Sequence, residues 1–368
     1  MIPAMNSGGA QRLLVDICQE LKKRGKYEPA IAILTNEHNR FEKELHGIEV
    51  KQFNIPRHVS ILALHRPHLQ PLQEYVHAFA PDVIHTHIYF SDLIINQINY
   101  SKAKFFSHIH GPTTQYDTRL FAGWPFKKRM VAFIERWLMM REYKKRNTSF
   151  LAVSAEYTAY TKTILPEIAS RVHLLHNGIK LDAKNTCGEK KLPQLIRMVS
   201  VGRLEKVKGF ELAIQVAEYL HRKEAAFVLD IFGEGEQKST LQSLINEKRL
   251  QDIVALSGFN AHMKNDYYKY AIYLHTAIKE PFGLTLVEAM AAGLPVVCTD
   301  GGGNRDIMQD GVNGYLVHER DANILAEKIL FLINNPRLYT QMSKAAIATA
   351  QQFTIERCVD KLIQYYES

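Results

Sequence analysis

The chain has 368 residues, of which 46% are hydrophobic and 23% charged, a composition typical of a globular protein large enough for two domains. No apolar run approaches the ~20 residues that a membrane-spanning helix needs, and residues 1–9 lack the basic region expected of a signal peptide. The four cysteines, Cys18, Cys187, Cys298 and Cys358, contain no Cys-x-x-Cys pair, which disfavours disulfide frameworks and zinc ribbons and fits a reducing compartment.

The net charge of +8 lies entirely in the first half of the chain. Residues 1–175 carry 23 Lys+Arg and 15 Asp+Glu, whereas residues 176–368 carry 23 of each. Within the first half, residues 119–146 hold nine basic and two acidic side chains. This one-sided charge predicts a polyanionic partner, and anionic lipid or a lipid diphosphate fits better than nucleic acid, for which the sequence has no binding signature.

Residues 5–24 predict a Gly-rich turn followed by an amphipathic helix, which Asn6 or Ser7 could cap. Gly8 and Gly9 carry no side chain, so their backbone could approach a ligand closely. A doubly wound domain normally opens with a buried strand, but only five residues precede this turn. We therefore expect a truncated first strand, with Met1 internal to the natural one. The apolar stripe of the helix comprises Leu13, Leu14, Ile17, Cys18 and Leu21.

Segments of strand and helix character then alternate, which predicts a parallel sheet with ligands at the carboxyl ends of its strands. His85 and His87 end one such strand, and His108 and His110 end the next. A histidine at a strand end is more often structural than catalytic. The expected strands are 29–35, 48–54, 81–87, 104–111, 149–153 and 172–179, with helices over 60–79 and 91–101.

Residues 124–146 contain both tryptophans of the chain and an apolar stripe with basic clusters at each end. This pattern suits a helix lying on an anionic membrane surface. An ordinary connecting helix would instead pack the stripe on the sheet. For the stripe we expect packing on the sheet, and for the basic ends and the preceding loop 112–126 we expect contact with the membrane.

The polar segment 179–195 reads as a linker to a second α/β domain. That domain opens with a strand and the loop Gly-Arg-Leu-Glu-Lys-Val-Lys-Gly, in which Arg203 and Lys208 could converge on one anion. Further strands follow at 227–232, 253–259 and 295–299, and helices at 321–335, 337–352 and 353–368. The Gly301-Gly302-Gly303 turn permits a close ligand approach.

The stretch 279–293, Lys-Glu-Pro-Phe-Gly-Leu-Thr-Leu-Val-Glu-Ala-Met-Ala-Ala-Gly, carries the strongest signal. Pro281 and Gly283 interrupt the backbone, so a helix should begin near Leu284 and end at Gly293. The free N–H groups of Gly283 to Leu286 at its positive end would form an anion site suited to a diphosphate.

This Glu-x7-Glu stretch, from Glu280 to Glu288, resembles the signature of the retaining GT-B glycosyltransferases of family GT4. The loops around Gly8 and Arg203 resemble the family's loops, and the likeness covers nearly the whole chain. It implies two Rossmann-like domains facing a cleft, with the C-terminal helix crossing back. The expected boundaries are 1–178 with 353–368 for the acceptor domain, and 196–352 for the nucleotide-sugar domain.

The resemblance also implies a role for each candidate residue. Glu280 and His110 would contact the donor sugar as catalytic residues, with His108 as the alternative to His110. Glu288 would hold the ribose, and Gly258 and Phe259 would cradle the base. The diphosphate would be bound by Arg203, Lys208, Gly8, Gly9, Gly283, Leu284 and Thr285. Gln11 and Asp306 stand where the family usually has Glu.

The chain contains no Asp-x-Asp, the usual motif that holds a metal at the diphosphate. The sequence therefore predicts a metal-independent hexosyltransferase without a cofactor, whose acceptor is a lipid-linked saccharide of surface-polysaccharide synthesis. It would work in the cytoplasm, peripherally on the plasma membrane. The alternatives are a catalytically silent partner subunit of another glycosyltransferase and a GT-B nucleotide-sugar epimerase.

Overall fold

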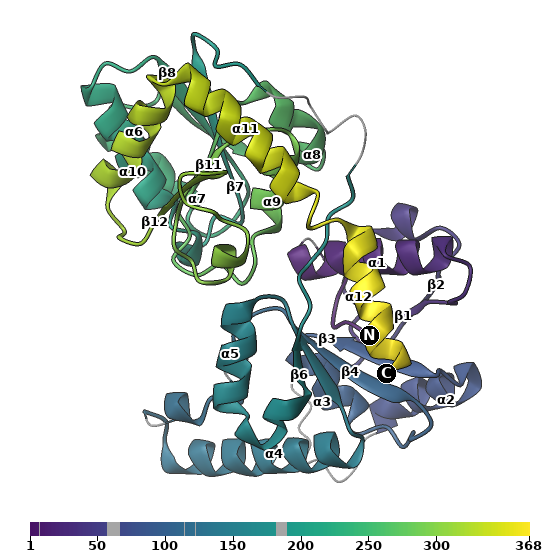
Figure 1. The fold of residues 1–368 in the computed structure, drawn as a ribbon. Helices are drawn as coiled ribbons and strands as arrows, with labels where there is room; N and C mark the ends of the chain where they lie inside the picture. Colours follow the sequence, from purple (N-terminus) through teal and green to yellow (C-terminus); the bar gives the residue numbers. More distant parts are fainter. Residues whose placement is uncertain (7, 57–66, 114, 122, 182–189) are drawn as a thin grey trace. The chain divides into compact units, whose positions relative to one another are not determined.

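The computed structural model describes residues 1–6, 8–56, 67–113, 115–121, 123–181 and 190–368. The chain divides into two compact units (Figure 1). Unit 1 comprises Met1–Asn177 and Ile355–Ser368, and unit 2 comprises Gly178–Thr354. Residues 182–189 of the predicted linker at 179–195 lie outside the described residues.

Unit 1 is built on parallel strands, as the β-α alternation predicts. Four strands pair in the order β3-β4-β5-β6, and β1 pairs with β2. Their bounds are β1 (Ala30–Ile33), β2 (Glu49–Gln52), β3 (Val83–His87), β4 (Lys104–Ile109), β5 (Ser149–Ala152) and β6 (Val172–Leu174).

The first residues of the chain join these two groups of strands. Ile2 N–H donates to the carbonyl of Ala32 at 3.1 Å and Ile2 accepts from Leu34 at 3.0 Å, while Met1 accepts from His87 at 2.9 Å. Residues 1–3 therefore occupy the place of the short first strand that the sequence predicts before the Gly-rich turn.

The helices of unit 1 differ from the sequence prediction in one cap and in one length, because the helix predicted over 91–101 ends at Ile95. Helix α1 has Gly8 as its N-cap with no side-chain cap, so the predicted Asn6 cap is wrong, and Ser7 lies outside the described residues. The Asn6 side chain instead accepts a hydrogen bond at Oδ1 from Gln11 Nε2, at 3.0 Å. The α-helices are α1 (Gly9–Lys23), α2 (Gln70–Phe79), α3 (Tyr89–Ile95), α4 (Phe126–Lys145), α5 (Ala155–Ile164) and α12 (Ile355–Glu367), with 3₁₀ turns η1 (Glu42–Leu45), η2 (Pro67–Leu69), η3 (Thr118–Phe121) and η4 (Pro166–Arg171). The start of the predicted 60–79 helix lies outside the described residues.

The C-terminal helix α12 crosses back to unit 1, as predicted. Its buried residues Val359 and Leu362 share one apolar cluster with Leu13 and Ile17 of α1. Arg24 at the end of α1 adds a bond from its Nη2 to the carbonyl of Glu356 at 3.0 Å. All five residues of the predicted α1 stripe are buried.

The stripe of α4 does not pack on the sheet, contrary to the sequence expectation. Only the last turns of the helix supply buried residues, Met139, Met140 and Tyr143. The preceding turns leave their apolar side chains exposed: Phe126, Met130, Val131, Phe133, Ile134 and Trp137. Among the described residues, no helix has the length and apolar character needed to cross a membrane.

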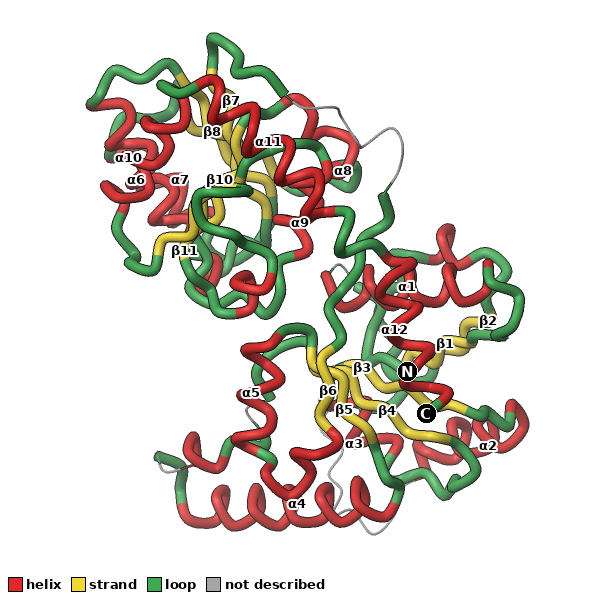
Figure 2. The backbone as a smooth tube through the Cα atoms, in the orientation of Figure 1, coloured by secondary structure: helices red, strands yellow, loops and turns green. Residues whose placement is uncertain are grey.

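Unit 2 contains a six-stranded parallel sheet in the order β12-β11-β10-β7-β8-β9 (Figure 2). Counted within the unit, this is the doubly wound order in which β7 and β10 are neighbours and the winding reverses between them. Its strands are β7 (Ile196–Val201), β8 (Phe227–Phe232), β9 (Val254–Gly258), β10 (Ile272–His275), β11 (Val296–Thr299) and β12 (Gly314–Val317). Its helices are α6 (Phe210–Arg222), α7 (Lys238–Glu247), α8 (Met263–Asp266), α9 (Leu284–Ala291), α10 (Ala322–Ile333) and α11 (Pro336–Ala350), with turns η5 (Lys206–Lys208), η6 (Tyr267–Lys269) and η7 (Gly303–Asp306).

Candidate active site

The loops that follow β7 and β10 meet in unit 2 at the point where the sheet reverses its winding, the usual ligand position in such sheets. The loop after β7 ends in η5 and Gly209, whose φ of +64° favours glycine. A Cβ on Gly209 would lie 2.3 Å from the carbonyl oxygen of Thr276. Glycine therefore lets the two loops touch, which carries Lys208 to the segment after β10.

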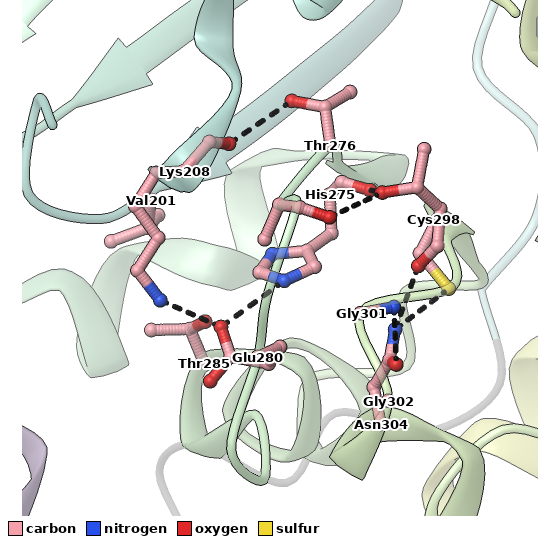
Figure 3. Close-up of polar contacts among 12 residues, drawn as sticks. Val201, Lys208, His275, Thr276, Glu280, Thr285, Cys298, Gly301, Gly302 and Asn304 are labelled. Carbon is pink, nitrogen blue, oxygen red and sulfur yellow. Dashed lines mark hydrogen bonds and ion pairs between the residues drawn. The ribbon is translucent and has the colours of Figure 1, made fainter. Parts of the chain in front are cut away.

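Lys208 and Glu280 form the centre of this site (Figure 3). Lys208 Nζ donates to Glu280 Oε2 at 2.7 Å, across 72 residues of sequence. His275 Nε2, at the end of β10, lies 3.2 Å from the same oxygen but is not aligned as a hydrogen-bond donor. Glu280 is only 7% exposed. Two functional groups, of Lys208 and His275, therefore meet at the carboxylate of Glu280.

Glu280 stays ionised despite its burial. Burial by itself would raise the pKa of this carboxyl, but contact with His275 and the charge of Lys208 outweigh it and lower the pKa to about 2. The site thus holds a fixed negative charge beside a fixed positive one at neutral pH.

The Gly-rich turn after β11 holds the backbone of Glu280. Glu280 N–H donates to the carbonyl of Gly301 at 2.8 Å, and Gly303 N–H donates to the carbonyl of Glu280 at 2.9 Å. Asn304 fixes the turn from inside, accepting from Gly301 N–H at 2.9 Å and donating to the carbonyl of Thr299 at 2.8 Å. The close approach for which this turn needs glycine is therefore to the chain's own backbone at 280–281, where a Cβ on Gly303 would lie 1.9 Å from the Pro281 oxygen.

Helix α9 begins at Leu284, as predicted, with Gly283 as an N-cap that has no side-chain cap bond. One predicted anion donor is wrong, because the N–H of Leu286 already donates to the carbonyl of Gly283 at 3.0 Å. This bond tightens the first turn, and it leaves the N–H groups of Gly283, Leu284 and Thr285 as the predicted donors. The Thr285 hydroxyl oxygen accepts from Tyr273 Oη at 2.8 Å, which ties the helix start to β10.

The other predicted residues of unit 2 stand apart from the Lys208–Glu280 pair. Arg203 does not join Lys208, because its guanidinium pairs with Glu205 at 2.6 Å, the acidic side chain two residues away. Glu288 lies in α9 and pairs with Lys264 at 3.5 Å. Gly258 ends β9 with a φ of +71°, and the side chain of Phe259 is 59% exposed.

The predicted residues of unit 1 lie at the carboxyl end of β4 and at the start of α1. His110 Nε2 lies 2.8 Å from His87 Nδ1, and burial lowers the pKa of His110 to about 3. Gly8 lies beside Gln11, where a Cβ on the glycine would be 2.4 Å from Gln11 Oε1, and Gly9 starts α1. Three imidazoles, of His85, His87 and His108, are the one group among the described residues whose nitrogens could hold a metal ion.

Sequence reasoning missed His275. The signal that could have found it is its place at the carboxyl end of a buried strand, five residues before Glu280, the same rule that selected His87 and His110.

Two protein-family models match the chain, one in each half. The model described as Glycosyltransferase Family 4 matches residues 7–183, and the model described as Glycosyl transferases group 1 matches residues 189–349.

Several characterised proteins are similar to part of the chain. Poly(ribitol-phosphate) alpha-N-acetylglucosaminyltransferase of Staphylococcus aureus is 31% identical over 46% of this chain and 34% of its own length. Putative colanic acid biosynthesis glycosyltransferase WcaL of Salmonella typhimurium is 31% identical over 46% of this chain and 45% of its own length. The chain spans between a quarter and a half of the length of the curated relatives that it matches.

Solved structures share the whole fold. Anabaena Alr3699/HepE in complex with UDP and glucose has a TM-score of 0.77 at 18% identity, covering 100% of this chain and 98% of that one. WaaG, a glycosyltransferase involved in lipopolysaccharide biosynthesis, has a TM-score of 0.73 at 16% identity, covering 100% and 98%. At these identities the likeness establishes the fold, which is GT-B.

Proposed function

The chain belongs to the GT4 type of group 1 glycosyltransferases, and from that premise we propose that it transfers a hexose from a nucleotide-diphosphate sugar to a lipid-linked saccharide of surface-polysaccharide synthesis. The transfer retains the anomeric configuration and needs no metal at the diphosphate. The donor is a uridine diphosphate sugar, a choice supported by the HepE structures with UDP and UDP-glucose.

One observation carries this proposal: the ion pair of Lys208 with Glu280 directly before α9. Glycosyl transfer separates charge, because the leaving diphosphate becomes more negative while the anomeric carbon becomes more positive. A half-buried cation and a buried anion held 2.7 Å apart offer one partner to each end of the breaking bond.

The diphosphate meets Lys208 and the first N–H groups of α9. Lys208 is a compact point charge, and the helix start adds aligned donors and the positive end of the helix dipole. Arg203 is two-thirds exposed and pairs with Glu205 at the surface, so it can turn to the phosphates when the donor arrives. Preorganised donors of this kind stabilise the negative charge on the leaving diphosphate, which is the role of the metal ion in enzymes with an Asp-x-Asp motif.

Glu280 faces the sugar and stabilises the positive charge that develops at the anomeric carbon. Because the pKa of Glu280 is about 2, the carboxylate is present at any physiological pH. Glu288 accepts from the ribose hydroxyls, and Gly258 and Phe259 border the base. His110 contacts the donor sugar from unit 1 as a neutral imidazole, since burial keeps its pKa near 3.

The test is turnover of the purified chain with a panel of UDP-, GDP- and ADP-sugars, followed as release of the nucleoside diphosphate. We expect UDP release, at least tenfold slower in Glu280→Ala. The exposed Glu236→Ala in the same unit is the matched control and should turn over normally. Normal turnover of Glu280→Ala would contradict the assignment, and donor binding without any turnover would indicate a silent partner subunit.

Two further measurements address the finer claims. The anomeric configuration of the product, read by NMR, should equal that of the donor. Activity should persist in EDTA, because the charge on the diphosphate is met by Lys208 and backbone N–H groups. Loss of activity in EDTA that Mg²⁺ restores would overturn the metal-independent mechanism.

We also propose that α4 lies on the cytoplasmic face of an anionic membrane, where the lipid-linked acceptor resides. Its exposed apolar side chains include Phe126 at 77% and Trp137 at 61% exposure, and they stand among the basic residues of 119–146.

Sedimentation with vesicles tests this surface. The chain should bind phosphatidylglycerol vesicles and not phosphatidylcholine vesicles, and Phe126→Glu with Trp137→Glu should abolish binding. Phe331→Glu, at an aromatic residue of α10 that is 54% exposed, is the matched control. Unchanged binding of the double variant would exclude α4 as the membrane contact.

A further inference from the structure

Four histidines form a continuous array on one face of the unit 1 sheet. In the parallel pairing of β3 and β4, His87 lies opposite His108. His85 precedes His87 by two residues and His110 follows His108 by two, so strand alternation places all four side chains on the same face. The ring centroids of neighbouring members are 4.3 to 5.2 Å apart.

This array is buried but incompletely bonded. His108 is 1% exposed, and neither of its ring nitrogens has a hydrogen-bond partner among the residues that the structure describes. His85 Nε2 is also buried without a partner in the same part of the chain. Leaving a buried polar atom unpaired destabilises a protein, so three such nitrogens in one cluster indicate a ligand that binds there.

The bonded nitrogens point to the same conclusion. His85 Nδ1 lies 2.6 Å from the hydroxyl oxygen of Tyr366, and His87 Nδ1 lies 2.8 Å from His110 Nε2. With the proton on Nδ1 in both rings, the lone pair of each falls on Nε2. Histidines that bind metals show this arrangement, in which the far nitrogen donates to a neighbour and so fixes the ring.

We propose that His85, His87 and His108 bind a transition-metal dication of the zinc class. Candidate ligand nitrogens of these three residues all lie within 4.8 Å of one another. Bonds of about 2.1 Å to one ion would bring neighbouring nitrogens to about 3.4 Å in a tetrahedral site, which small side-chain rotations achieve. His110 supports the site by holding the ring of His87.

The chemistry of the ligands selects the metal. Neutral imidazoles suit Zn²⁺, Co²⁺, Ni²⁺ and Cu²⁺, whereas Mg²⁺ and Ca²⁺ require oxygen ligands. The buried carboxylate nearest in sequence, Asp92, lies on the other face of the sheet. It accepts from Thr86 and Ser107, which alternate with the histidines along β3 and β4. The three proposed ligands all belong to unit 1, and the metal site shares one supporting residue, His110, with the transferase proposal.

Cobalt provides the probe, because tetrahedral Co²⁺ absorbs visible light. The full-length protein, without a polyhistidine tag and treated with a chelator that is then removed, is titrated with Co²⁺ and afterwards with Zn²⁺. We expect one equivalent of Co²⁺ to give a visible d–d band that Zn²⁺ abolishes and Mg²⁺ does not. Zn²⁺ should also raise the melting temperature.

The matched variants are His108→Phe and the exposed His46→Ala. His108→Phe keeps a ring in the array but removes both unpaired nitrogens, so Co²⁺ affinity should fall at least tenfold while His46→Ala binds like the wild type. Melting of the metal-free variants shows that each is folded. Absence of the band in the wild type, or equal Co²⁺ affinity in His108→Phe, would overturn the proposal.

Discussion

The two units place buried ionisable groups at the carboxyl ends of neighbouring parallel strands, but in opposite states. In unit 2, Lys208 and Glu280 are charged and paired, with His275 beside them. In unit 1, the four imidazoles are neutral, because burial lowers the pKa of each, and His108 has no hydrogen-bond partner among the described residues.

The difference shows how far the side chains of each region satisfy one another without a ligand. Opposite charges satisfy each other, so the site in unit 2 keeps its geometry in the free protein and offers a ready charge to each end of a bound donor. The imidazoles of unit 1 satisfy one another only in part, since His87 bonds to His110 while His108 has no partner among the described residues, and we propose that a metal ion completes the array. Removing one of these side chains should therefore lower activity or the unfolding free energy in unit 2, and should change the unfolding free energy little in unit 1.

The largest effect should come from Lys208→Ala. Loss of one preorganised cation at the leaving diphosphate should lower kcat on the order of a hundredfold, measured as nucleoside diphosphate release. The exposed Lys206→Ala, two residues away in η5, controls for charge in the same loop. Similar kcat values for the two variants would remove Lys208 from the catalytic site.

Glu280→Gln should lower stability in a pH-dependent way. The pKa of Glu280 is lowered from 4.5 to about 2 by folding, which corresponds to about 3 kcal/mol of stability present above pH 4.5 and lost as the pH falls toward 2. Urea unfolding of the wild type and Glu280→Gln should thus differ by up to about 3 kcal/mol at pH 7 and by a smaller amount at pH 3.5. A difference that does not depend on pH would show that the carboxylate is not held ionised by its neighbours.

Gly303→Ala tests the support beneath Glu280. The added Cβ would stand 1.9 Å from the carbonyl oxygen of Pro281, so the turn must shift, with a loss of about 1–3 kcal/mol in unfolding free energy and a lower kcat. Gly123→Ala is the control, because a Cβ there meets no described atom within 4 Å beyond its chain neighbours. An unaffected Gly303→Ala would mean that the turn does not hold Glu280 in place.

The smallest effect on the unfolding free energy should come from His108→Phe in unit 1, measured on the metal-free protein. Replacing a buried ring that has two unpaired nitrogens with an apolar ring should leave the unfolding free energy unchanged or raise it by about 1 kcal/mol. Urea unfolding in the presence of a chelator measures this. A loss of 2 kcal/mol or more would show that His108 has partners in the folded protein, and the contrast between the two units would fail.

Much of this organisation could be predicted from the sequence, because it depends on local chemistry. The alternation of apolar strands with helices gave both parallel sheets, the five apolar positions of α1 are all buried, and Pro281 with Gly283 marked the start of α9 at Leu284. The assignment to GT4 rested on the same short stretches. Periodicity, glycine and proline act over a few residues, so their effects can be read without the fold.

The tertiary structure decided which of these groups meet. Lys208 reaches Glu280 across 72 residues only because β10 pairs with β7, and the same pairing adds His275, whereas Arg203 turns to the adjacent Glu205. The sequence likewise does not reveal the exposed stripe of α4, nor that the ring nitrogens of His108 lack a partner within the described part of the chain. Residue type and spacing set what each segment can do, but strand order and burial determine which charges are paired and which remain to bind a ligand.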